Sequence, residues 1–287
     1  MSGRTVPSPT GGAFGARLQR AVAEHGPLLA GVDPHAALLE AWGLPDSAEG
    51  VREFSRAVLA ATAGRVAAIK PQSAFYERHG SAGIAALEEL LAGAREQGLL
   101  TILDVKRGDI GSTMDAYAEA FLRPGAPLEA DAITASPYLG AESLDPAVDL
   151  ALEHGKGVFV LSLTSNPSGP QVQHAVDEQG RPVALTMARH AEARGGGDDS
   201  TWGSLGLVVG ATVGDAYRRL GIDTAAPHVP LLAPGFGAQG AGPAELAEVF
   251  GESAGQVLVS VSRALLAAGP DVAALEQRLA ALRAEYS

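Results

Sequence analysis

Two charged residues interrupt an apolar run of the sequence, LTILDVK (100–106), at positions 104 and 106. Side chains two apart in a strand lie on the same face, so Asp104 and Lys106 would face one side together. Burying two charges costs several kcal/mol per ion unless they are paired, and an isolated pair of this kind is typical of a structural salt bridge. Lys70 ends an earlier apolar run and Asp109 follows Lys106 closely, which is more charge than one ion pair needs. The pattern favours a functional Lys/Asp cluster.

Other polar residues follow apolar runs in the same way. Asp33 ends LLAGVD (28–33), and Thr164 and Ser165 end GVFVLSLTS (157–165). Thr113 stands at the start of the helix expected after Asp109. The GVDPH sequence around Asp33 could also be a simple turn signal.

A second candidate site lies near the end of the chain. The segment LAPGFGAQGA (232–241) is rich in glycine, and glycines such as Gly235 let backbone N–H groups approach an anion closely. Gln239 could add a side-chain donor. Ser262 and Arg263 lead into the next helix, where an arginine interacts unfavourably with the helix dipole unless an anion lies between them. A flexible loop with a surface arginine is the alternative, but the combination predicts a phosphate site.

Eight short apolar, β-branched runs alternate with helical stretches and would position these residues. Continuous apolar character is typical of parallel strands buried on both faces. The runs span 28–33, 66–71, 100–106, 131–137, 157–165, 205–212, 229–235 and 256–263, and the clearest helices span 82–98, 243–251 and 271–286. Strict alternation predicts an α/β protein with a single (β/α)₈ TIM barrel, whose active site lies at the carboxyl ends of the strands. No G-x-G-x-x-G turn follows the first run to support a doubly wound open sheet.

The domain organisation follows from this pattern. We expect a flexible N-terminal tail over 1–12 and one barrel domain over 13–287. The interval at about 166–204 is longer than the others, and its Gly/Pro-rich start predicts a loop over one end of the barrel. The GGGDDS stretch (195–200) is interpreted as a flexible surface excursion.

Composition excludes several classes of function. The chain has no cysteine, so disulfides and thiolate chemistry are excluded, and no apolar run reaches the ~18 to 20 residues of a membrane span. A net charge of −12, from 33 acidic and 21 basic residues, argues against nucleic acid and anionic membranes as partners. A cytoplasmic location is the simplest expectation. The seven histidines lack metal-ligand spacing, and His35 and His174, which could reach the site, are more simply solvated surface residues.

The motif DVKRGDIGST (104–113) resembles the active-site signature of the orotidine 5′-phosphate decarboxylase family. The resemblance covers nearly the whole chain, since GVDPH, AIKPQ, TASPYLG, TSNP, APGFGAQG and VSR follow in the family's order. The D-x-K-x-x-D motif alone also occurs in related phosphosugar barrels, whereas the full ordered set is specific. The long segment after the fifth run is similar to that of a longer bacterial subgroup of the family.

The resemblance implies a role for each matching residue in the cofactor-free decarboxylation of orotidine 5′-monophosphate, a step of pyrimidine biosynthesis. Lys106 would protonate C6 of the ring, and Asp104 would lie against the substrate carboxylate. Lys70 and Asp109 would complete the charged array, with Asp109 supplied by the other subunit of a homodimer. The remaining residues would bind substrate: Asp33, Lys70 and Thr113 the ribose, Ser165 the pyrimidine, and Gln239, Arg263 and backbone N–H groups near Gly235 and Ser262 the phosphate.

Three other interpretations remain open. A magnesium-dependent phosphosugar decarboxylase or aldolase would resemble this chain at 104–109, but such relatives tend to carry an acid where Lys70 stands. A Schiff-base aldolase needs a lysine of lowered pKa, and the flanking Asp104 and Asp109 would raise the pKa of Lys106. A catalytically silent nucleotide-binding barrel would have no use for four charged residues that are costly to bury.

Overall fold

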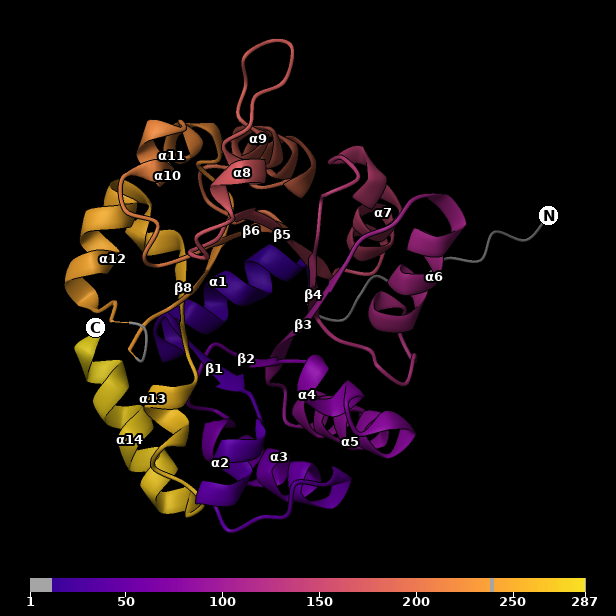
Figure 1. Ribbon diagram of the computed structural model, residues 1–287, viewed down its shortest axis with the longest axis vertical. Coiled ribbons are helices and arrows are strands. Elements are labelled where there is room, and N and C mark those ends of the chain that lie inside the picture. Colours follow the sequence, from indigo (N-terminus) through magenta and orange to yellow (C-terminus); the bar gives the residue numbers. More distant parts are fainter. Residues whose placement is uncertain (1–11, 238–239, 287) are drawn as a thin grey trace.

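The structure is a computed structural model that describes residues 12–237 and 240–286 (Figure 1). Its strands follow one another in chain order around a closed parallel barrel, in which β8 pairs with β1. The (β/α)₈ barrel expected from the sequence is therefore confirmed. The strands are β1 (Leu28–Val32), β2 (Ala68–Pro71), β3 (Leu100–Arg107), β4 (Ala132–Ala135), β5 (Gly157–Leu163), β6 (Leu205–Val209), β7 (Leu231–Pro234) and β8 (Val257–Val261).

Helices connect the strands and form a ring around the barrel (Figure 1). Several connections hold more than one helix, which strict alternation does not predict. The helices are α1 (Phe14–His25), α2 (Ala36–Ala41), α3 (Ala48–Thr62), α4 (Ala74–Glu77), α5 (Gly80–Glu96), α6 (Gly111–Leu122), α7 (Asp145–Glu153), α8 (Pro170–Gln173), α9 (Val183–Gly195), α10 (Ala216–Arg219), α11 (Ile222–Ala225), α12 (Pro243–Phe250), α13 (Arg263–Leu266) and α14 (Val272–Glu285). Over the described ranges, none of them has both the length and the apolar character that crossing a bilayer requires.

Most strands end before the apolar runs that predicted them. β1 ends at Val32 and β8 at Val261, so Asp33 and Ser262 lie just outside the barrel ladder. Every residue of both strands is buried, one face against the lumen and the other against the helices. The polar residues at the ends are therefore free to turn toward the mouth of the barrel, which is where an active site forms in this fold.

Helix α1 closes the amino-terminal end of the barrel and lies across the centre of the ring in Figure 1. Phe14 and Leu18 are fully buried in the lumen, in one cluster with strand residues such as Phe159. The Phe14 ring packs edge-on against Phe159, with ring centroids 6.1 Å apart. Gly157 at the start of β5 makes room for it, because a Cβ there would lie 2.3 Å from the Phe14 ring. The lumen is thus a packed core, sealed at one end.

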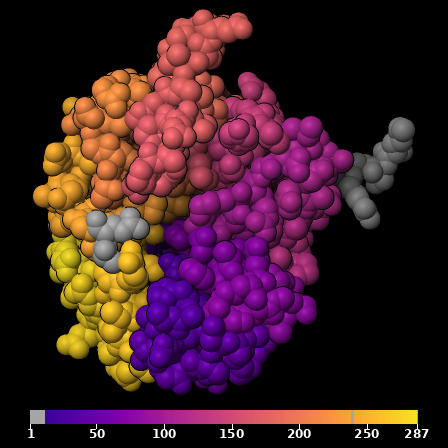
Figure 2. Space-filling view, viewed as in Figure 1, coloured from indigo at the N-terminus to yellow at the C-terminus, as the bar shows by residue number. Residues whose placement is uncertain are grey.

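The predicted long loop at 166–204 is only partly a loop. Its second half is helix α9, whose Ala184, Met187 and Ala188 are buried against the barrel, so this part belongs to the ordinary helical layer. The connection between α8 and α9 projects from the molecule at the top of Figures 1 and 2. In the GGGDDS stretch, Asp198 and Thr201 form an isolated bridge. The expected N-terminal tail lies outside the described residues, apart from Gly12.

Candidate active site

Three predicted residues form a continuous charged chain at the carboxyl ends of β2 and β3. The Asp104 carboxylate is its centre: Oδ1 lies 2.6 Å from Lys106 Nζ and Oδ2 lies 3.4 Å from Lys70 Nζ. Lys70 Nζ in turn lies 4.0 Å from Asp33 Oδ1. Asp104 and Lys70 are 8% and 7% exposed, whereas the Lys106 side chain is 44% exposed. The structure therefore joins two buried groups to one lysine that can reach a ligand.

Lys106 is held in an unusual backbone conformation. Its φ is +46°, and within the described ranges no other non-glycine residue has a positive φ. Such a conformation costs about 1–3 kcal/mol and persists only where neighbouring groups enforce it. Here the Lys106 N–H donates to Thr134 Oγ1 at 3.0 Å, and the β3–β4 register shifts between Leu103 and Arg107. The local strain aims the end of β3 at the mouth of the barrel.

Electrostatics keep Lys70 and Asp104 charged. Burial by itself would lower the pKa of Lys70, but the carboxylates of Asp33 and Asp104 outweigh it and the pKa is raised. Burial would likewise raise the pKa of Asp104, but the charges of Lys70 and Lys106, with hydrogen bonds from Lys106 and Thr134, lower it. Both residues are therefore ionised at neutral pH, and a fixed negative charge faces the space above β3.

A cavity of about 240 Å³ adjoins this chain at the mouth of the barrel. It is lined by Asp33, His35, Lys70, Phe75, Pro234, Gly235, Phe236, Ser260, Ser262 and Arg263. Two polar atoms, Asp33 Oδ1 and Ser262 Oγ, are buried without a hydrogen-bond partner. Among the residues that the structure describes, Arg263 forms no hydrogen bond or ion pair through its side chain. A hydroxyl and a carboxylate oxygen without hydrogen-bond partners, together with an arginine that is unpaired among the described residues, are typical of a site for a polar, anionic ligand.

The other predicted residues do not all join this arrangement. Asp109 is absent from the ion pairs of the described chain, and its Oδ1 accepts a hydrogen bond from the Ile110 N–H at 2.8 Å. Thr113 is exposed in the first turn of α6, and Ser165 is exposed just after β5. Gln239 lies outside the described residues. The Lys/Asp cluster of one chain thus contains three of its four predicted members.

Sequence reasoning missed Thr134 and undervalued His35. Thr134 on β4 donates to Asp104 Oδ1 at 2.7 Å, and its hydroxyl also holds the Lys106 backbone. Its spacing of two residues from Ala132 on a buried strand could have placed it in the lumen. His35, interpreted as solvated surface, is half-buried and lines the cavity. His174 lies at the end of α8 and does not line this cavity.

Two further findings bound the site. A larger cavity of about 550 Å³ lies beside the α8–α9 segment, but it contains no member of the charged chain, so its size does not make it the reactive centre. In the described part of the chain, no three His, Asp or Glu side chains are grouped so that they could hold a metal ion.

The fold and the site together define a TIM-barrel enzyme with a Lys/Asp centre beside a cavity that Asp33 and Arg263 line. The family model described as "Orotidine 5′-phosphate decarboxylase / HUMPS family" matches residues 20–278, and the chain belongs to this family. A protein from Streptomyces coelicolor named orotidine 5′-phosphate decarboxylase is 57% identical over 263 residues, which cover 91% of this chain and 92% of that one.

Solved structures agree with this family. A crystal structure from Streptomyces avermitilis, with a provisional orotidine 5′-phosphate decarboxylase assignment, is 52% identical and superposes with a TM-score of 0.91, covering 100% of this chain and 98% of that one. The Leishmania donovani OMP decarboxylase structure is 32% identical with a TM-score of 0.74, covering 94% of this chain and 98% of that one.

Proposed function

We propose that the protein decarboxylates orotidine 5′-monophosphate to uridine 5′-monophosphate, the step of pyrimidine biosynthesis implied by its family, without a metal or organic cofactor. The observation that carries this proposal is the Lys70–Asp104–Lys106 chain, with Lys106 Nζ 2.6 Å from the carboxylate and partly open to the mouth of the barrel.

The chemistry of the reaction suits these residues. Loss of carbon dioxide leaves an electron pair on C6 that the ring π-system cannot absorb, so the enzyme must supply a nearby cation and a proton. Lys106 offers both. Asp104 would lie beside the substrate carboxylate, and two carboxylates about 4 Å apart repel by about 4 kcal/mol at an effective dielectric of ~20. That repulsion accounts for about three decades of rate at most, so binding realised in the transition state must provide the rest.

The cavity supports the expected substrate contacts. Asp33 and Lys70 line the cavity and would contact ribose hydroxyls, and Thr113 would join them when the ligand is bound. Ser165 would contact the pyrimidine amide. The phosphate would lie at the β7–β8 end of the cavity, where Gly235, Ser262 and Arg263 meet, with Gln239 as an additional donor. Phosphate contacts remote from C6 could then help to close loops over the reacting ring.

We also propose a homodimer in which Asp109 serves the partner's site. Two features support it: Asp109 pairs with neither lysine of its own chain, and Ile110 beside it is 63% exposed. Other large exposed apolar residues lie in segments that follow β4 and β5, namely Tyr138, Leu139, Val172 in α8, and Val176. Exposed apolar patches are typical of protein interfaces.

The decisive experiment treats purified protein with EDTA and follows the orotate-ring absorbance after orotidine 5′-monophosphate is added. We expect full loss of the absorbance, because Lys70 stands where a magnesium-dependent relative would carry an acid. Activity that disappears on chelation and returns with magnesium would instead favour the phosphosugar decarboxylase or aldolase. Binding without any absorbance change would favour a silent nucleotide-binding barrel. The cytoplasmic location and the lack of nucleic-acid or membrane partners stay predictions.

A further inference from the structure

His35 lines the same cavity as Asp33 and Arg263, yet the roles proposed above leave it unused. It follows β1 in a tight turn, in which the His35 N–H donates to the Asp33 carbonyl oxygen at 2.8 Å across Pro34. The turn places the two side chains on one wall of the cavity. The ring is also held in place, because it packs against Phe75 with centroids 6.0 Å apart and an interplanar angle of 58°.

One hydrogen bond fixes the proton on the His35 ring. Nδ1 accepts the Leu38 N–H at 3.3 Å, which caps the start of α2. A ring nitrogen that accepts a hydrogen bond carries no proton, so the neutral ring holds its proton on Nε2. The described residues offer Nε2 no hydrogen-bond partner. His35 therefore presents an N–H donor that none of the described residues uses.

The charges around the cavity indicate which ligand group this donor serves. Lys70 is engaged with Asp33 and Asp104, so its charge is largely balanced. Among the described residues, Arg263 is the cation of the cavity whose side chain forms no ion pair, and Ser262 Oγ is a buried hydroxyl without a hydrogen-bond partner. An anionic group is therefore expected on the Arg263 side. The His35 N–H lines the same cavity and could add a hydrogen bond to that anion.

We propose that His35 donates its Nε2–H to a phosphoryl oxygen of the substrate, and so helps the enzyme to select a 5′-phosphorylated nucleotide over its nucleoside. The proposal rests on the proposed function for the identity of the nucleotide. Arg263 would supply the charge, and His35, which follows the neighbouring strand β1, would supply a directional donor.

The test uses the full-length His35→Asn variant. Asparagine is a good helix cap whose side-chain oxygen can accept the Leu38 N–H, while its shorter side chain removes the Nε2 donor. We expect kcat/KM for orotidine 5′-monophosphate to fall roughly ten- to hundredfold, the range for losing a hydrogen bond to a charged group. The value for unphosphorylated orotidine should stay within about twofold, since only the phosphate contact is lost.

Ser47→Ala is the matched control. Ser47 caps α3 through the Gly50 N–H at 3.3 Å, does not line the cavity, and its loss should lower thermal stability without changing the ratio between the two substrates. Equal losses for both substrates in His35→Asn would show that His35 only positions Asp33 or contacts the ribose, and would overturn the proposal. No loss for either substrate would overturn it as well.

A binding measurement separates this proposal from the proposed function. Calorimetric dissociation constants for uridine 5′-monophosphate and uridine do not depend on turnover. If the wild-type protein fails to decarboxylate, the proposed function fails. His35 is then still judged by whether His35→Asn weakens the nucleotide roughly ten- to hundredfold and leaves the nucleoside unchanged.

Discussion

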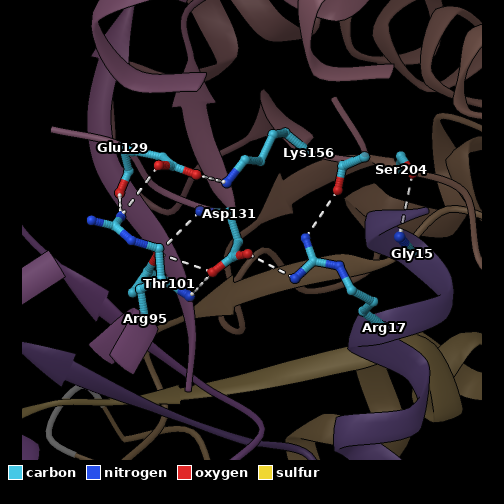
Figure 3. Close-up of polar contacts among 9 residues, drawn as sticks. Gly15, Arg17, Arg95, Thr101, Glu129, Asp131, Lys156 and Ser204 are labelled. Carbon is cyan, nitrogen blue, oxygen red and sulfur yellow. Dashed lines mark hydrogen bonds and ion pairs between the residues drawn. The ribbon is translucent and has the colours of Figure 1, made fainter. Parts of the chain in front are cut away.

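Buried ion pairs occupy both ends of this barrel, but the groups that form them have all their hydrogen-bond partners at only one end. At the amino-terminal end, Lys156 and Glu129 are 2.7 Å apart and both are almost fully buried (Figure 3). Asp131 accepts hydrogen bonds from the Thr101 N–H and from Arg17 on α1. Every one of these groups has a partner, and for Asp131 one of the partners comes from α1.

The carboxyl end combines burial with unmet hydrogen bonds. Asp33 Oδ1 and Ser262 Oγ lack hydrogen-bond partners, and Arg263 is unpaired among the described residues. Lys106 has a strained backbone and a partly exposed side chain. Buried charge alone therefore does not identify a catalytic site in this molecule. A catalytic site is indicated where buried charge occurs together with unused hydrogen-bonding groups, backbone strain and a cavity. Those features lower the stability of the protein unless a ligand is bound.

The largest expected effect on activity comes from substitutions at the carboxyl end of the barrel, which we call the open end. Lys106→Ala and Asp109→Asn should each be nearly inactive as homodimers. If Asp109 serves the partner's pocket, a mixed dimer has one pocket with both defects and one with neither. Random mixing of equal amounts then leaves about a quarter of all pockets intact, by the symmetry of a two-fold dimer. Unfolding and refolding the two variants together should recover up to about a quarter of wild-type activity.

That experiment needs proof of subunit exchange, for example from tagged chains separated after refolding. A mixture that exchanges subunits and yet remains as inactive as its parents would assign Asp109 to its own chain's pocket, or to none.

Substitutions at the amino-terminal end of the barrel, which we call the closed end, should lower stability and leave catalysis unchanged. Lys156→Met removes the buried cation beside Glu129 and leaves Arg95 and the Gly125 N–H as its partners, which should lower the free energy of unfolding by up to about 3 kcal/mol. The matched change, Lys106→Met, removes a partly exposed amine and should cost no more than about 1 kcal/mol. Urea titrations measure both, and kcat of Lys156→Met should remain near wild type. Equal stability losses would remove the distinction between the two ends.

Sequence patterns predicted the barrel and the Lys/Asp cluster at the carboxyl ends of its strands, because both depend on residues that are close together in the sequence. Apolar runs encode buried parallel strands, and Lys70, Asp104 and Lys106 follow them directly. The closed end was not predicted. Arg17 and Asp131 are far apart in the chain and meet only when α1 crosses the completed barrel.

Local sequence patterns also failed to predict conformations that depend on contacts between residues far apart in the sequence. The positive φ of Lys106 depends on the Thr134 hydroxyl and the β3–β4 register shift. Helix α9 was not predicted, because the polar, Gly/Pro-rich segment before it indicated a loop. His35 is half-buried because its ring packs against Phe75, which follows a different strand.

A smaller effect tests the anion site of the open end. Arg263→Ala should weaken binding of 5′-phosphate ligands by roughly ten- to hundredfold, since hydrogen bonds between charged groups contribute about 1.5–3 kcal/mol. Unphosphorylated nucleosides should bind almost unchanged. Calorimetry with uridine 5′-monophosphate and uridine measures both, and equal losses would show that Arg263 does not contact phosphate.

The smallest effect concerns acid stability of the closed end. Burial by itself would raise the pKa of Glu129, but Lys156, the Gly125 N–H and Arg95 lower it below the usual 4.5. A lowered folded-state pKa gives stability that is present above the unfolded value and is lost as pH falls through the folded value. Urea titrations from about pH 6 to pH 3 should therefore show a shallower loss for Glu129→Gln combined with Lys156→Met than for wild type. Parallel curves would show that this pair does not contribute to acid unfolding.

The left-handed backbone at Lys106 has a consequence for anyone who engineers this barrel. Glycine adopts a φ near +46° without the strain of about 1 kcal/mol or more that a side chain suffers there. A library screened only for heat resistance would therefore tend to enrich Lys106→Gly, which by the role proposed for Lys106 would be an inactive protein. Selection for robustness and selection for turnover oppose each other at this position, so a thermostabilised version must keep the lysine fixed and gain its stability elsewhere.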